Sequence, residues 1–277
     1  RLAHYLADCD NEVTQHELVE ELAFYRGSEA QRKDLMTLAT SFGYKNNIII
    51  KKRVLDDIEF FLGETLMETD LNSLTVGIST DIAYNYQTDH PPFDQLHKLT
   101  TASGYHYTTH GFVNGHRKSE NAIPGFDLLI FDCDGDVSIS TVKVLLEDYT
   151  FLISTTKRHT EDINRFRLIL PISHKIKLTA NDYSRFMTNV FEWLPFPVDE
   201  AAKDIARKWA GYAGNYEYNK GDIMDATLFI PETKRSDETK AQISATGIGN
   251  IERWFRTHTT KGNRANHLYR YGMVMID

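Results

Sequence analysis

The chain has 277 residues, of which 41% are hydrophobic, 25% charged and 12% aromatic, and its formal net charge at pH 7 is −8. This composition is typical of a globular protein, and its apolar runs are far shorter than the roughly 20 residues that cross a bilayer, so no membrane span is expected. With only Cys9 and Cys133, a disulfide framework and a four-cysteine zinc site are excluded, which favours a reducing, cytoplasmic setting. The first residues include neither Met nor a signal-peptide pattern, and we expect the sequence to be a piece of a longer chain.

The net charge hides an asymmetry between the two halves of the sequence. Residues 1–150 hold 12 Lys and Arg against 24 Asp and Glu, whereas residues 151–277 hold 19 against 15. Residues 151–177 alone contain six basic and two acidic residues. This local excess predicts an anion-binding surface, with a merely solvated charged face as the alternative.

Residues 1–75 are predicted to form a helical N-terminal region. Apolar residues recur there at spacings of three and four, as in Leu18, Leu22 and Tyr25, and Val54–Leu66 places its apolar residues on one helical face. We expect this region to be a packing appendage without chemistry.

Residues 76–232 change to short apolar or β-branched runs between turn residues, which is an α+β pattern. In chain order we expect a buried strand at Phe126–Phe131, a helix at Ser138–Glu147 and a strand at Tyr149–Thr155. A strand at Arg165–Ile172, ended by Pro171, and a helix from Thr179 to about Trp193 follow. Residues 233–277 are interpreted as a linker, 233–249, and the start of a helical C-terminal region, 251–271.

Asp132 and Asp134 stand where the first buried strand ends. Side chains two apart on a strand project to the same face, so these carboxylates can hold divalent cations between them. The alternative is a turn-forming Asp-Gly, in which only one Asp matters.

A second group of polar residues leaves the next strand and opens the one after it. If these strands are antiparallel, the two ends lie close and the side chains form a cradle for a polyanion such as a triphosphate. The residues are Lys157, Arg158, His159, Arg165 and Arg167. A third carboxylate, Asp199, follows Pro197-Val198 and precedes Arg207 and Lys208. Taken alone, Asp199 reads as a helix N-cap.

Four features together resemble the archaeo-eukaryotic primase (AEP) superfamily, specifically phage- and plasmid-type primase-polymerases. They are the Asp132-x-Asp134 pair, His159 where the next strand ends, the strand that begins Arg165-Phe166-Arg167, and the Val198-Asp199 pair. The likeness covers roughly residues 105–215 and includes the segment Gly115–Asn121. It implies an RRM-like antiparallel sheet with flanking helices. Lys261–Leu268 is similar to the helical region that follows such domains, and a helicase domain is expected after it.

The resemblance implies template-dependent nucleotidyl transfer in phage or plasmid replication, with two Mg²⁺ or Mn²⁺ ions held by Asp132, Asp134 and Asp199. His159 matches the histidine that contacts the incoming nucleotide. The family commonly has Ser two places before that histidine, and Lys157 stands here instead. Apart from what the resemblance implies, we expect the phosphates of the NTP or dNTP, or the single-stranded DNA template, to be bound by basic residues. These are Lys157, Arg158, Arg165, Arg167 and Arg207.

Two alternatives use some of the same residues. Ile130–Gly135 also resembles the opening motif of haloacid dehalogenase-like phosphatases, with Asp132 as nucleophile and Ser154 or Thr155, Asp222 and Asp225 as supporting residues. The other alternative is a non-catalytic DNA-binding module of replication initiation, in which only the basic half of the chain acts.

Overall fold

The computed structural model describes residues 48–55, 58–231, 233–244 and 250–276. The chain divides into two compact units, one of Arg1–Met67 with Ile230–Thr239 and one of Glu68–Phe229 with Lys240–Asp277. The helices predicted before residue 48 lie outside the described residues. The domain boundaries expected from the sequence stay predictions.

In the first unit, strands β1 (Ile48–Leu55) and β2 (Ile58–Thr65) form an antiparallel hairpin in which Ile48 lies opposite Thr65. The helix predicted over Val54–Leu66 is therefore wrong. The apolar spacing of that segment fits a helix, but the β-branched run Ile48-Ile49-Ile50 supplies a partner strand, and cross-strand pairing overrides the helical period.

The second unit contains the predicted succession of strand, helix, strand, strand and helix. These elements are β7 (Phe126–Asp134), α5 (Ile139–Leu145), β8 (Phe151–Thr155), β9 (Arg165–Ile176) and α6 (Ala180–Trp193). Strand β9 lies between β7 and β8 and is antiparallel to both, and β11 (Tyr216–Asn219) pairs with the outer side of β8. This mixture of helices and an antiparallel sheet confirms the α+β class.

Local signals set the ends of these elements as expected, with one exception. The Ser138 side chain accepts from the Thr141 amide at the start of α5, and Thr179 accepts from the Asp182 amide at the start of α6. The prediction that Pro171 ends its strand is wrong, since β9 continues to Ile176. Pro171 is tolerated because β8 pairs no further than Ile169 and the β7 register shifts near that point.

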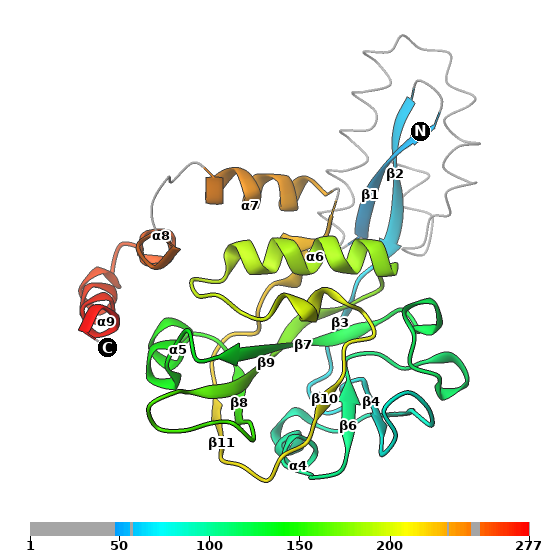
Figure 1. The fold of residues 1–277 in the computed structure, drawn as a ribbon. Helices are drawn as coiled ribbons and strands as arrows, with labels where there is room; N and C mark the ends of the chain where they lie inside the picture. Colours follow the sequence, from blue (N-terminus) through cyan, green and yellow to red (C-terminus); the bar gives the residue numbers. More distant parts are fainter. Residues whose placement is uncertain (1–47, 56–57, 232, 245–249, 277) are drawn as a thin grey trace. The chain divides into compact units, whose positions relative to one another are not determined.

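Helix α6 covers one face of this sheet (Figure 1). Its Phe191 ring lies 6.0 Å from the Phe131 ring, and its Tyr183 and Phe186 rings lie 5.1 and 5.4 Å from Phe126. Edge-on aromatic contacts of this kind contribute about 0.5–1.5 kcal/mol each beyond their buried area. Because strand side chains alternate, Asp132 points away from the face that Phe131 shares with α6.

A second antiparallel sheet lies on the side of the first sheet that faces away from α6 (Figure 1). Its strands run in the order β10 (Trp209–Ala210), β6 (His106–Thr108), β4 (Val76–Ser79) and β5 (Gln87–Asp89). The two sheets meet where the Arg167 guanidinium of β9 donates to the Tyr107 hydroxyl of β6, at 3.1 Å, and to the Ala210 carbonyl of β10.

Three helices follow the sheets, at residues where the sequence predicts a linker and one basic helix. They are α7 (Lys234–Ser244), α8 (Asn250–His258) and α9 (Arg264–Ile276). The linker prediction is wrong for 234–244, and the predicted helix 251–271 is two helices. Helices α8 and α9 attach to the end of α5, because the Trp254 indole donates to the Leu145 carbonyl and Arg270 donates to the Val144 carbonyl, both at 3.0 Å.

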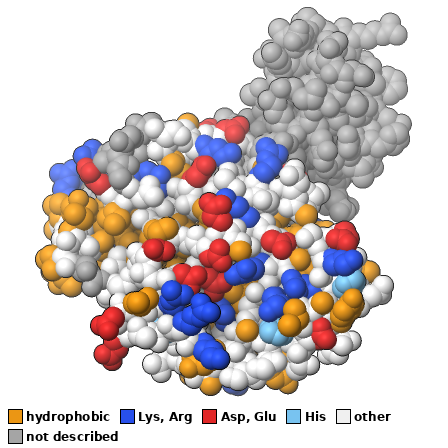
Figure 2. Space-filling model, viewed as in Figure 1, with side chains coloured by type: hydrophobic (Ala, Val, Ile, Leu, Met, Phe, Trp, Pro, Cys, Tyr) orange, Lys and Arg blue, Asp and Glu red, His pale blue; other side chains and the backbone are white. Residues whose placement is uncertain are grey.

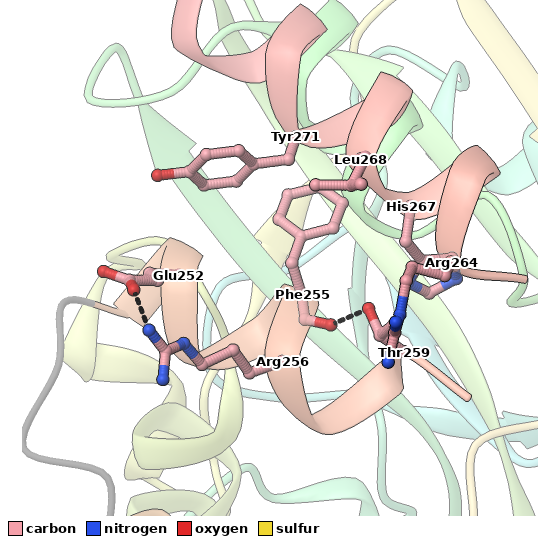
Figure 3. A pocket seen from close by; sticks show the side chains of 8 residues that line it. All are labelled: Glu252, Phe255, Arg256, Thr259, Arg264, His267, Leu268 and Tyr271. Atoms are coloured by element: carbon pink, nitrogen blue, oxygen red, sulfur yellow. Dashed lines mark hydrogen bonds and ion pairs between the residues drawn. The ribbon is translucent and has the colours of Figure 1, made fainter. Parts of the chain in front are cut away.

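A pocket of about 440 Å³ lies between α8 and α9 (Figure 3). Phe255, Leu268 and Tyr271 form its apolar part, and the Arg256 guanidinium at its edge is paired with Glu252 at 2.7 Å. None of the carboxylates singled out from the sequence lines this pocket.

The remaining short elements complete the described fold. They are β3 (Met67–Glu68), α4 (His97–Thr100), η1 (Phe93–Gln95), η2 (Val113–Gly115), η3 (Ser119–Asn121), η4 (Glu200–Lys203) and η5 (Ala226–Phe229). Across the residues with described coordinates, no helix has both the length and the apolar character to cross a membrane.

Burial of His110 makes the stability of this fold depend on pH. The ring is 1% exposed and lies against Phe126 and Tyr183, and desolvation lowers its pKa from 6.5 to about 3. An unfolded histidine takes up a proton near pH 6.5, so between pH 6.5 and 3 the unfolded state binds one more proton and folding stability falls as pH falls.

We expect this residue to remove up to about 1.4 kcal/mol of unfolding free energy per pH unit below pH 6.5. Urea unfolding at pH 7, 6 and 5 measures the slope. His110→Gln should flatten the slope by that amount, while His90→Gln, which changes an exposed ring, should leave it intact. An unchanged slope in His110→Gln contradicts the assignment.

Candidate active site

Asp132 and Asp134 each face an arginine directly across the sheet. The register between β7 and β9 places Asp132 opposite Arg167 and Asp134 opposite Arg165. The Arg167 Nε donates to an Asp132 carboxylate oxygen at 3.0 Å, and Arg165 donates to Asp134 at 3.2 Å. The inner pair is largely buried, with side chains 14% and 16% exposed, whereas Asp134 is 59% exposed.

Asp199 lies beside Asp132 although 66 positions separate them in the chain. Its backbone amide donates to the Asp132 carbonyl at 3.0 Å, along the edge of β7 that β9 leaves free. Its side chain accepts from the Ala201 amide at the start of η4, so the interpretation as a helix cap also holds.

One arginine nitrogen joins these two carboxylates. Arg207 Nη2 lies 3.1 Å from an Asp132 oxygen and 3.0 Å from an Asp199 oxygen. Two carboxylates therefore converge on a single cation-sized position. Among the described residues, Arg207 Nε is a buried donor without a hydrogen-bond partner, so this side chain retains one unmet donor beside the carboxylates.

The turn between β8 and β9 brings His159 to the start of β9, as expected for an antiparallel pair. The Arg165 amide donates to His159 Nδ1 at 3.1 Å. A ring nitrogen that accepts is unprotonated, so the proton of the neutral ring sits on Nε2. Lys157 and Arg158 are exposed in the same turn. The turn thus places a histidine donor and two exposed cations, Lys157 and Arg158, close to the Asp134–Arg165 pair.

Further positive charge gathers beyond Arg207, and sequence reasoning missed part of it. Burial lowers the pKa of Lys208, and the charges of Arg117, Arg207 and Arg167 lower it further. Burial also lowers the pKa of His106, whose Nδ1 lies 3.4 Å from the Lys208 ammonium. Arg117 could have been found, because it lies within the segment Gly115–Asn121 that carries the family likeness, but no sequence signal marks His106.

One supporting residue of the phosphatase alternative, Asp222, does not join Asp132. Asp222 forms a backbone bridge with Tyr149, and the Thr150 hydroxyl donates to the Gly221 carbonyl at 2.6 Å. These contacts are at the beginning of β8, whereas the strand end that faces Arg167 and Asp132 is at Ser154. Asp222 therefore lies at the opposite end of the sheet.

The donor set fits a divalent cation only in part. Within the part of the chain that the structure describes, no three His, Cys, Asp or Glu side chains gather as a metal cluster. Asp132 and Asp199 share one position, which an arginine nitrogen occupies, and Asp134 is turned toward Arg165. Carboxylate oxygens are suitable ligands for Mg²⁺ or Mn²⁺, and Arg207 competes for the same oxygens.

The sequence matches no protein-family model and no curated protein. Among solved structures, the chain is similar to the AEP domain of the primase-polymerase of cyanophage S-2L, with 10% identity and a TM-score of 0.35, over 59% of this chain and 91% of that one. So distant a likeness carries no functional assignment.

The difference in burial between the two ion pairs predicts different costs of neutralising each carboxylate. Asp132→Asn should lower the free energy of unfolding by about 2 kcal/mol, because Arg167 loses its charged partner in a dry environment. Asp134→Asn should cost less than about 1 kcal/mol, since its pair is solvated. Urea titration of both variants measures this, and equal costs would contradict the assigned geometry.

Proposed function

We propose that this chain catalyses template-dependent nucleotidyl transfer, as a DNA primase or primase-polymerase that uses divalent metal ions. The observation that carries the proposal is the convergence of Asp132 and Asp199 on one cation position, beside a turn that presents His159. The match of Asp132-x-Asp134, His159 and Val198-Asp199 to the primase motifs supports it.

Asp132, Asp134 and Asp199 are the residues that would hold Mg²⁺ or Mn²⁺. Such ions lower the pKa of a primer 3′-hydroxyl and neutralise charge on the reacting phosphates. With ions held by these carboxylates, Arg207 and Arg165 would no longer pair with them. Their guanidinium groups would then be available to phosphate oxygens.

The basic residues near these carboxylates align the incoming NTP or dNTP. The His159 Nε2–H can donate to a phosphate oxygen, because the Arg165 amide already holds the other ring nitrogen. Lys157 and Arg158 add positive charge from the same turn, and the unmet Nε donor of Arg207 suits a phosphate oxygen. Nucleotidyl transfer depends mainly on such alignment and charge stabilisation.

We expect the chain to incorporate labelled nucleotide on a primed single-stranded DNA template with Mn²⁺ or Mg²⁺. Asp132→Asn and Asp199→Asn should each lower the rate by about 100-fold or more, because several kcal/mol of charge stabilisation is lost. Asp222→Asn is the matched control, since that exposed carboxylate lies at the other end of the sheet.

The outcome of this assay distinguishes the proposed polymerase from the phosphatase and from the non-catalytic DNA-binding module. Metal-dependent incorporation that depends on Asp132 and Asp199 supports the polymerase. Release of phosphate from small esters, with loss in Asp132→Asn, supports the phosphatase. A chain that binds DNA and shows neither activity supports the non-catalytic module.

Competition between Arg207 and a metal ion can be measured without catalysis. Removing one positive charge from the shared position should strengthen Mn²⁺ binding to Arg207→Gln by about tenfold, equivalent to roughly 1.4 kcal/mol of repulsion. Titration of the chain followed by Mn²⁺ paramagnetic resonance gives the affinity, and Asp199→Asn should weaken it. Equal affinities of the wild type and Arg207→Gln would show that the cation binds elsewhere.

A further inference from the structure

A second group of basic side chains stands next to the carboxylates and comes from elements other than the β8–β9 turn. Arg117 follows η2, His106 is in β6, and Lys208 precedes β10. An Arg117 nitrogen donates to the Ala206 carbonyl at 2.6 Å, which ties it to the segment that carries Arg207 and Lys208. Burial lowers the pKa of Lys208, and the charges of Arg117, Arg207 and Arg167 lower it further.

A stacked aromatic pair, of which the tyrosine is exposed, borders these basic side chains. The Tyr84 and His116 rings stack with centroids 4.6 Å apart and planes inclined by 21°. Tyr84 is 55% exposed, and the adjacent Ile82 is 60% exposed. A ring that is stacked on one partner and still more than half exposed has surface left for a second flat group. Figure 2 shows Lys and Arg side chains gathered beside Asp and Glu side chains on one face of the molecule.

The loop that presents Tyr84 is held by its own hydrogen bonds. The Asp81 carboxylate accepts from the Ala83 and Tyr84 amides at 2.7 and 2.9 Å, and the Ser79 hydroxyl donates to the Tyr84 carbonyl at 2.7 Å. The backbone bonds to Asp81 lower the pKa of that carboxyl. These hydrogen bonds hold the loop in this conformation, so the loop does not need a bound ligand to become ordered.

The loop is also tied to the segment that carries His116. Arg117 donates to the Ile82 carbonyl through Nε and to the Ala83 carbonyl through its amide, both at 2.8 Å. Gly115, at φ +64°, lies so close to Tyr86 that a Cβ there would stand 2.9 Å from the Tyr86 carbonyl oxygen. These bonds hold the two segments together, and the Arg117 bond to the Ala206 carbonyl adds the segment of Lys208. We call the residues Tyr84, His116, Arg117 and Lys208 the 84/116 surface.

We propose that the 84/116 surface binds a single-stranded nucleic acid, with one base on the Tyr84–His116 pair and backbone phosphates on Arg117 and Lys208. Aromatic faces interleaved with cations suit a strand better than a lone triphosphate, because each base brings both a flat ring and a charge. The inference rests on the proposed function in one respect: the strand is the template, led toward Asp132 by the adjoining Arg207.

Fluorescence anisotropy with a labelled oligothymidylate, in the absence of metal and nucleotide, tests this on the whole chain. Tyr84→Ala should weaken binding by about tenfold, the effect typical of losing one base–aromatic stack. Tyr84→Phe, which keeps the ring, should bind as the wild type does. Tyr269→Ala is the matched control, since that tyrosine of α9 is 68% exposed and outside the surface.

A charge variant tests the phosphate contact separately. Lys208→Gln should reduce the slope of log affinity against log salt concentration by about 0.7, the value for one phosphate contact with a single strand. Lys98→Gln, which changes an exposed lysine of α4, should leave the slope unchanged. Full affinity in Tyr84→Ala, or an unchanged slope in Lys208→Gln, overturns the proposal.

Failure of the proposal for the 84/116 surface can be distinguished from failure of the proposed polymerase function. If the wild type incorporates nucleotide and Tyr84→Ala binds the strand normally, the polymerase assignment stands and this surface is wrong. If the strand binds in a Tyr84-dependent manner but no nucleotide is incorporated, the surface stands and the polymerase assignment is wrong.

Discussion

A carboxylate removed from water needs a charged or hydrogen-bonding partner, and in this fold Asp132 has two. Arg167 approaches it from the neighbouring strand, and Arg207 approaches from the segment that returns after α6. Uncompensated burial of such a charge costs several kcal/mol. This requirement ties the end of β7, the middle of the sheet and the returning segment to one another, and the remainder of the site is arranged around it.

The β7–β9 register is what distributes the charges. Paired residues of an antiparallel ladder share a face. On the side away from α6, the two aspartates of β7 therefore lie opposite the two arginines of β9. A slip of one residue would move both carboxylates into the aromatic layer under α6. The apolar residues on the other face of β7 and β9 therefore protect the register, and through it the geometry of the site.

The same ion pairs that stabilise the site oppose its proposed use. Arg207 satisfies Asp132 and Asp199 without any metal, so the fold does not need a cation to compensate them. On the proposed function, a metal ion and this guanidinium compete for the same oxygens, and the arginine that leaves is suited to bind phosphate. Binding of the nucleotide and of the cation would then favour each other.

Between residues 126 and 193 the sequence alone determined the elements, because their signals act over a few residues: apolar runs, and the Ser138 and Thr179 caps. The same local reasoning failed at the β1–β2 hairpin, where a distant partner strand decides the structure, and at Pro171, where the local end of pairing makes a proline tolerable. Sequence motifs also singled out Asp132, Asp134, Asp199 and His159, but not the distances between them.

Only the tertiary structure decided that Asp199 lies on the free edge of β7 and that Tyr84, His116 and Lys208 share one surface. These residues come from segments that are far apart in the chain and are joined by hydrogen bonds, such as those from the Asp199 amide to Asp132 and from Arg117 to Ile82 and Ala206. A local pattern contains no information about such contacts, because they depend on which strand lies beside which and on the partners that buried charges require.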